Sequence, residues 1–384
     1  MTLACPPNCD PTSFDSYMKK TGEKLNFSRR RKREYLVQDS TNNTHSEQGN
    51  ETLKLTSKKR KILQKKNQKY KLKFPDLKKK VSKTNTKDTK IYYDSIDYQF
   101  NENLPKGVDN LNKDYFGTLH YLNGYSSEIY ENLRTREEKH LPSSDYMVAC
   151  QRDINQEMRE ILIDWLCDFV MGIELRTDTL FLAINYMDRF LSVKEVRKKH
   201  LQLVGVTCLW IASKYEEIEP PSIEDFVFIT KGSCSASQIR KCEIIVLTTL
   251  RFSLTVTTPK PLLRWYLRAA KATKKLVYLA NYLCEVQLYK YHFLNYSPSK
   301  IAASAVAVAQ LILQPHLKFE DIWSKNLQYY SRYSFHDLSP CCKQLLNLYK
   351  AAPKSKNRTV YRKYAKKKGL RVSAISLSEN FKFD

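Results

Sequence analysis

Apolar residues recur at helical spacing in successive segments between residues 126 and 350, and short polar stretches join these segments. Pro142 and the pair Pro220-Pro221 interrupt the pattern, because proline removes a helical hydrogen-bond donor. No strand is needed to account for it. The pattern predicts an all-α fold with helices over about 126–139, 155–171, 177–191, 199–215, 222–229, 235–250, 260–270, 274–290, 298–313, 319–330 and 336–350.

Two of these segments are apolar on nearly every side, which is typical of a buried helix. They run from Leu201 to Ala212 and from Ile301 to Ala309, and each is the third helix in a run of five. Gly205 and Ala212 leave room for neighbouring helices to approach. We therefore expect two consecutive five-helix bundles, each wrapped around a buried third helix. The helix near 126–139 precedes them.

The helix predicted over 155–171 carries more apolar surface than it needs to sit on a core. On a helical wheel, Met158, Ile161, Leu162 and Trp165 form one stripe, and neighbouring residues widen the apolar arc to roughly 200°, about twice the usual width. Such a helix is buried on most sides, or it leaves one face for a partner. Arg159 lies inside the arc, where a charge is costly unless paired, so a nearby carboxylate is expected.

The net charge of +25 belongs to the two ends of the chain. Residues 1–100 hold 24 Lys/Arg and 11 Asp/Glu, residues 350–384 hold 11 and 2, and residues 101–349 hold 30 and 27. The polar stretch before residue 120 buries too little apolar surface to fold, so we expect a disordered basic regulatory tail. Beyond Pro353 the basic chain is expected on the surface. The predicted parts are 1–120, 121–257, 258–353 and 354–384.

The tail contains a basic cluster that is typical of a nuclear import signal, the alternative being a solvated charge run. It consists of Arg29, Arg30, Arg31, Lys32 and Arg33. We therefore expect a nuclear protein that shuttles with the cytoplasm. The tail also holds two R-x-x-L strings, which are short enough to arise by chance. They are Arg33-Glu34-Tyr35-Leu36 and Arg60-Lys61-Ile62-Leu63.

The remaining composition argues against an enzyme. The ten cysteines form no C-x-x-C pair, and the nine glycines form no phosphate-binding loop. Cys167, Cys208, Cys242 and Cys284 lie within apolar helical patterns and are typical of reduced core thiols in an intracellular protein. We expect no catalytic residue, no cofactor and no metal. Without a signal core or a long apolar run, neither secretion nor a membrane partner is expected.

Particular strings in the chain resemble the cyclin box, and among cyclins the A/B type. The resemblance covers about residues 121–376. The segment Tyr146-Met147 to Asp153-Ile154 is more like cyclin A than cyclin B. The matching strings are Met158-Arg159-Glu160-Ile161-Leu162-Ile163-Asp164-Trp165-Leu166, Asn185-Tyr186-Met187-Asp188-Arg189-Phe190-Leu191, Ala212-Ser213-Lys214-Tyr215-Glu216-Glu217-Ile218, Tyr361-Arg362-Lys363-Tyr364 and Val372-Ser373.

This resemblance implies two tandem cyclin folds and a regulatory subunit without catalysis of its own. Such a subunit binds and activates a cyclin-dependent Ser/Thr kinase and controls progression through S phase and mitosis. Within the chain, Arg159 is expected to pair with Asp188, which supplies the missing carboxylate. The kinase-facing residues of the family fall on Lys214, Glu243, Tyr215, Leu250 and Phe252.

The resemblance also implies a shallow patch that receives R-x-L segments of substrates and inhibitors, although the same side chains could all be core. The patch maps to Met158, Ile161, Leu162, Trp165, Asp168, Leu201 and Gln202. Mitotic cyclins carry a destruction box read by the ubiquitin ligase of anaphase. Arg33 and Leu36 are the better placed pair for it, but the following Asn42 lies one position away from the usual offset.

Two rival functions use similar folds. A DNA-binding general transcription factor with paired cyclin folds would concentrate Lys and Arg in its folded body, whereas residues 101–349 are nearly neutral. We therefore expect no direct nucleic-acid partner. A transcriptional cyclin that pairs with an elongation kinase is the second rival. The string from Met158 to Leu166 favours the cell-cycle class instead.

Overall fold

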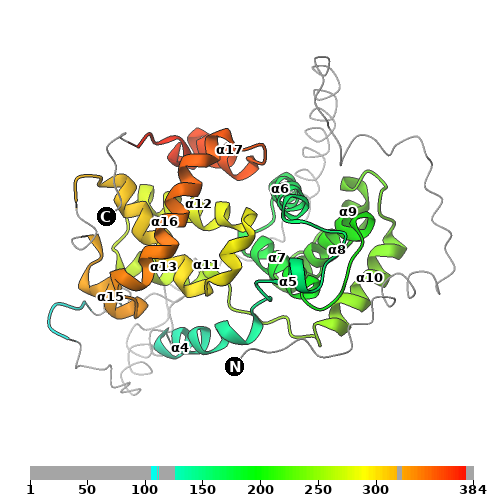
Figure 1. Ribbon diagram of the computed structural model, residues 1–384, viewed down its shortest axis with the longest axis horizontal. Coiled ribbons are helices and arrows are strands. Elements are labelled where there is room, and N and C mark those ends of the chain that lie inside the picture. Colours follow the sequence, from blue (N-terminus) through cyan, green and yellow to red (C-terminus); the bar gives the residue numbers. More distant parts are fainter. Residues whose placement is uncertain (1–104, 110, 112–125, 318–321, 378–384) are drawn as a thin grey trace, which may run out of the picture. The chain divides into compact units, whose positions relative to one another are not determined.

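The structure is a computed structural model that describes residues 105–109, 111, 126–317 and 322–377. Within these ranges the chain is helical and contains no strand, as predicted (Figure 1). Apart from residues 105–109 and 111, the predicted tail lies outside the described residues, and so do its basic cluster and both R-x-x-L strings. In the described part of the chain, no helix is long and apolar enough to cross a membrane. The same residues contain no group of His, Cys, Asp and Glu side chains arranged to hold a metal ion.

The first run of five helices forms around a buried central helix, as expected. It comprises α6 (Gln156–Gly172), α7 (Thr177–Leu191), α8 (Lys198–Glu216), α9 (Ile223–Ile229) and α10 (Ala236–Thr249). The central helix α8 packs against α6, α7, α9 and α10 (Figure 1). Every residue from Leu203 to Leu209 is buried. A Cβ atom added at Gly205 would lie 2.9 Å from Cδ2 of Leu162, so this glycine lets α6 pack closely on α8.

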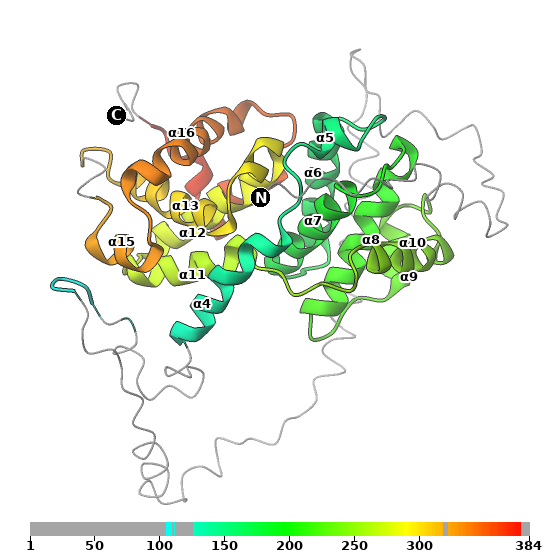
Figure 2. The same ribbon diagram turned by 60° about the horizontal axis from the view of Figure 1, so that its bottom comes forward.

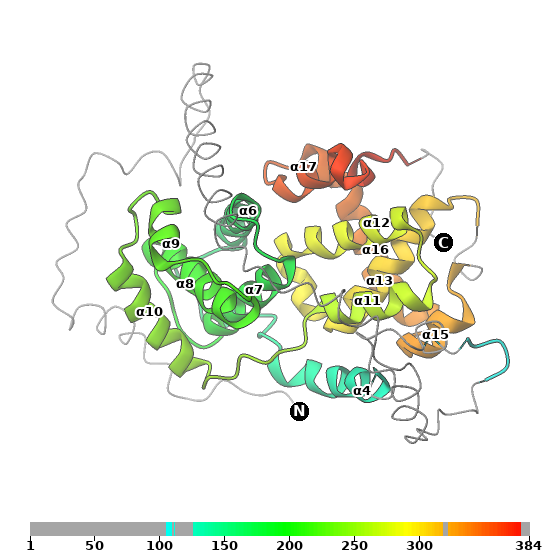
Figure 3. The same ribbon diagram turned by 180° about the vertical axis from the view of Figure 1, so that it is seen from behind.

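The second run repeats this plan around α13 (Pro298–Leu313). Every residue from Ile301 to Ala309 is buried, because α11, α12 and α16 all pack on this helix (Figure 3). Ser297 caps its start by accepting the backbone N–H of Lys300, and Pro298 occupies the first turn. The surrounding helices are α11 (Pro259–Ala269), α12 (Lys274–Val286), α15 (Lys325–Ser331) and α16 (Phe335–Ala351).

In the described part of the chain, α4 (Ser126–Glu137) and the short α5 (Tyr146–Ala149) precede the first run, and α4 lies beside α11 (Figure 2). The Tyr130 ring of α4 stacks on Trp265 of α11 with centroids 5.2 Å apart. The Glu137 carboxylate accepts the backbone N–H of Ser299 at 2.9 Å, so α4 is anchored to the second run. The short α5 was not expected, because four residues are too few to show helical periodicity.

The chain beyond Pro353 does not simply lie on the surface, and this expectation is wrong. Val360 and Tyr364 of α17 (Thr359–Ala365) are buried, and so is Val372. Tyr349 of α16 donates from its hydroxyl to the backbone oxygen of Val372 at 3.1 Å. The basic composition conceals this packing, because α17 packs on α6 and α12 while most Lys and Arg side chains of the segment are exposed. Lys363 is different, since it pairs with the buried Glu285 of α12 at 2.7 Å.

Candidate partner-binding surfaces

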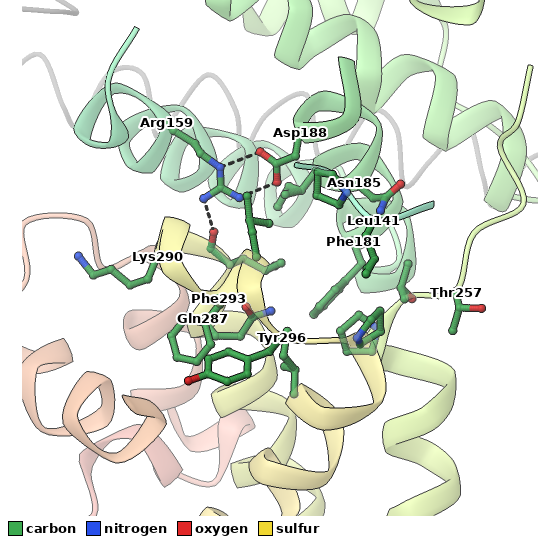
Figure 4. Close-up of a pocket in the computed structure, with 18 residues that line it drawn as sticks. Leu141, Arg159, Phe181, Asn185, Asp188, Thr257, Gln287, Lys290, Phe293 and Tyr296 are labelled. Atoms are coloured by element: carbon green, nitrogen blue, oxygen red, sulfur yellow. Dashed lines mark hydrogen bonds and ion pairs between the residues drawn. The ribbon is translucent and has the colours of Figure 1, made fainter. Parts of the chain in front are cut away.

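The predicted pair of Arg159 and Asp188 is present in the core. Both side chains are about 2% exposed, and Nη2 of Arg159 lies 2.6 Å from Oδ2 of Asp188. The Tyr146 hydroxyl donates to the same carboxylate at 2.9 Å. Arg159 also donates to the backbone oxygen of Leu288 at 3.0 Å, which links α6 to the second run (Figure 4). Burial lowers the pKa of Arg159, but Asp188 outweighs this effect and holds the pKa above its ordinary value.

A small pocket of about 80 Å³ lies beside this ion pair. Phe181, Phe293 and Tyr296 contribute to its largely apolar wall, with the ion pair at one side (Figure 4). Its volume suits a few water molecules rather than an organic ligand. The ion pair therefore has a structural role, because it joins the two runs of helices.

A second ion pair lies on the exposed side of α8 and α10. Lys214 near the end of α8 pairs with Glu243 of α10, and their side chains are 39% and 15% exposed. Trp210, one turn before Lys214, donates from its indole to Glu243 at 3.2 Å. The Lys214 ammonium lies 4.7 Å from the centre of the Trp210 ring. The aromatic ring and the carboxylate thus fix both charges at a defined place on the surface.

Exposed apolar side chains flank this second ion pair. Tyr215 is 45% exposed and Phe252 is 68% exposed. Arg251 and Phe252 both have positive φ angles, of 52° and 54°, and such a backbone is strained for residues other than glycine. The backbone N–H of Phe252 donates to the Leu247 oxygen at 2.9 Å, which closes the end of α10 and leaves the ring in solvent.

The α6 helix presents a third surface. Ile161 is 37% exposed, while Met158 and Trp165 are half-buried. The Trp165 ring meets Phe169 edge-on with centroids 5.9 Å apart. Asp168 is exposed, and Asp164 accepts hydrogen bonds from the Tyr289 hydroxyl and the Thr359 backbone N–H, both at 2.8 Å. The apolar and acidic residues therefore form adjoining strips along one helix.

The family models match nearly all of this described region. The model "Cyclin, N-terminal domain" matches residues 128–255, and "Cyclin, C-terminal domain" matches residues 248–378. The G2/mitotic-specific cyclin-B of Marthasterias glacialis is 38% identical over 281 residues, which are 72% of this chain and 70% of that protein. This chain belongs to the cyclin family.

A-type cyclins show the same level of similarity. Cyclin-A1-2 of Oryza sativa subsp. japonica is 40% identical to this cyclin over 248 residues, 63% of the chain. The match spans about half of the rice protein, 51% of its length. A viral cyclin from herpesvirus saimiri shares the fold, with a TM-score of 0.52 and 20% identity over 61% of this chain and 99% of the viral one. The tandem cyclin fold is thus confirmed by sequence and by structure.

Three residues expected on surfaces of this cyclin belong to its core instead. Leu250 is 5% exposed, because it caps α10 and faces the first run of helices. Leu162 is 6% exposed beneath the α6 surface, where its methyl groups occupy the space above Gly205. Leu201 is 5% exposed at the start of α8. Gln202 is half-buried, and its side-chain oxygen accepts the Ser233 hydroxyl at 3.3 Å.

Further residues on these surfaces were not predicted from the sequence pattern. Ile218 is 96% exposed just beyond α8, and Ile244 is 57% exposed next to Glu243. Trp210 was assigned to the central helix alone, although its position four residues before Lys214 places the two side chains on one face. Tyr146 carried no signal for its bond to Asp188, since the two residues are 42 positions apart.

Proposed function

We propose that this cyclin binds and activates a cyclin-dependent Ser/Thr protein kinase and contributes no catalytic residue itself. The observation that carries the proposal is the surface ion pair of Lys214 and Glu243, with the solvent-exposed side chains of Tyr215 and Phe252 on the same segments of the chain. A central pair of fixed charges with apolar neighbours is typical of a surface that docks one partner in one register. We propose that the activated kinase in turn controls progression through S phase or mitosis.

The activation proceeds by a shift in the kinase population. A protein kinase transfers phosphate only when its own Lys–Glu ion pair beside the nucleotide is closed. A partner that binds the closed form more tightly than the open form raises the closed fraction by its differential affinity. Lys214 and Glu243 offer one donor and one acceptor that can satisfy backbone groups of the kinase, and the apolar neighbours supply contact area.

Co-purification tests this proposal. Tagged full-length protein is isolated from cells, and the proteins that come with it are identified by mass spectrometry and assayed for kinase activity. We expect a Ser/Thr kinase with wild type and little or none with Lys214→Glu, because that substitution opposes two carboxylates. Recovery of the same active kinase by both proteins would refute the assigned surface. Absence of any kinase from the wild-type sample would refute the function.

We also propose that the α6 surface recruits substrates and inhibitors that carry R-x-L segments. Ile161, Met158 and Trp165 offer apolar contact for the Leu, and the exposed Asp168 can meet the Arg. A docked substrate has a raised effective concentration at the kinase, which increases phosphorylation without new catalytic groups. Leu162 and Leu201 support this surface from below.

A double substitution separates docking from activation. Met158→Ala/Trp165→Ala is expected to retain the kinase and its activity on a substrate without R-x-L, but to lose the preference for a substrate with it. The matched control is Glu157→Ala, an exposed change on the same helix. Equal phosphorylation of the two substrates by the wild-type complex would rule out the docking role.

The N-terminal tail carries the proposed localisation and turnover signals. We propose nuclear import through Arg29–Arg33 and degradation through a destruction box at Arg33 and Leu36, read by the ubiquitin ligase of anaphase. Fluorescent wild-type protein should concentrate in the nucleus and disappear after metaphase, whereas Leu36→Ala should persist. Disappearance of both proteins at the same rate would exclude this box.

A further inference from the structure

A second pocket, of about 310 Å³, lies where α6 meets the end of α12 and the segment leading into α17. Its lining combines two aromatic rings with many hydrogen-bond donors. The polar residues that line it are Glu160, Lys290, Lys354, Ser355, Asn357 and Arg358. This pocket shares only Lys290 with the small one beside Arg159, and none of its lining residues belongs to α8 or α10.

The charges in the larger pocket leave a net positive site. Lys290 pairs with Glu160 at 2.7 Å, so the one carboxylate of the lining is neutralised. Lys354 and Arg358 have no carboxylate partner within the described part of the chain. Arg358 only donates to the backbone oxygen of Pro353, at 3.4 Å. Both cations are exposed and belong to one short segment, so an anion can approach them from solvent.

A phosphate group fits this arrangement better than a carboxylate. A phosphorylated side chain carries about −1.5 to −2 charges and three acceptor oxygens, whereas a carboxylate carries one charge and two oxygens. The guanidinium of Arg358 can bind two phosphate oxygens at once, and Lys354 adds a point charge. Asn357 supplies a neutral donor in the same segment, whereas the Ser355 hydroxyl already donates to the backbone oxygen of Asn357 at 3.0 Å. The volume admits a side chain rather than a folded domain.

The pocket adjoins the docking surface of α6. Glu160 lines the pocket and Ile161 is the next residue on the helix, so the two sites lie roughly 100° apart around one helix. The bond from the Thr359 backbone N–H to Asp164, at 2.8 Å, ties α17 to α6. An extended peptide spans about 3.3 Å per residue, so a short segment of a docked chain can connect two sites on one helix.

We propose that this pocket binds a phosphoserine or phosphothreonine in the protein segment that docks on α6. The inference deepens the proposed function and rests on it for the source of the ligand, a phosphorylated substrate of the kinase. A substrate that has received one phosphate near its docking segment would then stay bound longer. Its remaining sites would be phosphorylated preferentially, which makes the cyclin selective for substrates with several sites.

Peptide binding to the purified full-length chain tests this directly, without any kinase. Fluorescent peptides carry one R-x-L segment and a serine four residues before or after it, in unphosphorylated, phosphorylated and glutamate forms. Phosphorylation on one side is expected to tighten binding about tenfold by fluorescence anisotropy. Lys354→Ala/Arg358→Ala should remove this gain and leave the unphosphorylated peptide unaffected. Lys356→Ala, an exposed neighbour outside the pocket, should retain it.

A gain-of-affinity variant guards against misfolding as an explanation. Glu160→Gln removes the competing carboxylate and frees Lys290, so the phosphorylated peptide should bind more tightly. An unchanged or weaker affinity would contradict the proposal. Equal binding of phosphorylated and unphosphorylated peptides, with the serine before or after the R-x-L segment, would also contradict it. So would a gain in affinity on phosphorylation that persists in Lys354→Ala/Arg358→Ala, or one that is lost in Lys356→Ala. A glutamate peptide that matched the phosphorylated one would overturn the assignment to phosphate.

The same experiment distinguishes failure of the pocket from failure of the docking surface. With Trp165→Ala, both peptides should weaken equally while the ratio between them stays constant. If the unphosphorylated peptide does not bind and the phosphorylated one binds through Arg358, the docking surface is wrong and the pocket stands. If both bind equally and depend on Trp165, the docking surface stands and the pocket is wrong.

Discussion

At the scale of single residues, the buried charge of Arg159 is fully compensated. Its guanidinium binds Asp188 through two nitrogens, at 2.8 and 2.6 Å, and a third nitrogen reaches a backbone oxygen of the second run. Asp188 is in turn held by Tyr146. A pair of this kind contributes little net stability over apolar residues, but removal of one member strands the other charge in the core.

Arg159→Ala is therefore expected to lower the free energy of unfolding by about 3–5 kcal/mol, because Asp188 remains buried without its partner. Urea denaturation followed by circular dichroism measures the change. The double variant Arg159→Met/Asp188→Leu removes both charges and should recover most of the loss. A single variant as stable as wild type would show that the pair carries no such role.

Buried thiols give a pH dependence with a definite sign. Burial raises the pKa of Cys234 to about 11 and the pKa values of Cys242, Cys284 and Cys341 to about 12. Unfolded thiols ionise from about pH 8.5, so between that pH and 12 the unfolded chain loses protons that the folded chain keeps. Stability is therefore fully present below about pH 8.5 and decreases as the pH rises.

The free energy of unfolding should stay level from about pH 7 to 8 and fall by more than about 2 kcal/mol by pH 10, since each such thiol contributes up to about 1.4 kcal/mol per pH unit. Urea titrations at each pH measure it. Cys242→Ala/Cys284→Ala should flatten the decline relative to its own stability at pH 7. A curve that stays level to pH 10 in wild type would contradict the raised thiol pKa values.

At the scale of elements, α6 divides its surface among three tasks. Arg159 faces the core, Ile161 faces solvent beside the half-buried Trp165, and Glu160 faces the pocket beside α17. Its width of apolar surface was evident from the sequence, and so was the need for a carboxylate near Arg159. Which apolar residues are exposed was not, because helical periodicity gives angles around an axis and not the positions of neighbouring helices.

The segment beyond residue 351 also shows what helical periodicity cannot predict. The periods of the long helices before residue 351 predicted their bounds within a few residues, since each has several turns and many apolar positions. The four-residue α5 was not predicted, and the seven-residue α15 begins at Lys325 rather than near residue 319. The seven-residue α17 lies in a basic stretch, and its burial depends on distant partners such as Glu285. Contacts across 78 residues leave no local pattern in a single sequence.

Tyr364→Ala tests the packing of α17. The Tyr364 hydroxyl donates to Glu285 at 2.7 Å, and Glu285 is 1% exposed, so the substitution removes a buried ring and leaves this carboxylate less well bound. We expect a loss of about 3–5 kcal/mol in unfolding free energy. Lys366→Ala, at an exposed position, should change it little. If Tyr364→Ala were as stable as Lys366→Ala, the segment would be a surface extension, as the sequence predicted.

At the scale of the whole molecule, the two proposed binding surfaces lie on different helices. The ion pair that joins the two runs is buried, whereas the pair of Lys214 and Glu243 is exposed at the far end of α8 from Leu201. The proposed docking surface on α6 and the proposed kinase-binding pair of α8 and α10 therefore lie on different helices, so we expect that each can be altered without the other. The basic charge of the chain lies at its two ends, and residues 101–349, which hold these surfaces, are nearly neutral.

The most direct test of kinase activation reverses the exposed ion pair. Lys214→Glu/Glu243→Lys keeps the attraction within the pair, although it removes the acceptor of the Trp210 indole, so the melting temperature should stay close to that of wild type. A partner, however, meets each charge at the other position. Kinase activity recovered with tagged wild type and with the swapped variant is compared after equal capture. We predict at least a tenfold loss in the swapped variant, about 1.4 kcal/mol of binding. Equal activity from both proteins would contradict the central claim that this surface activates the kinase.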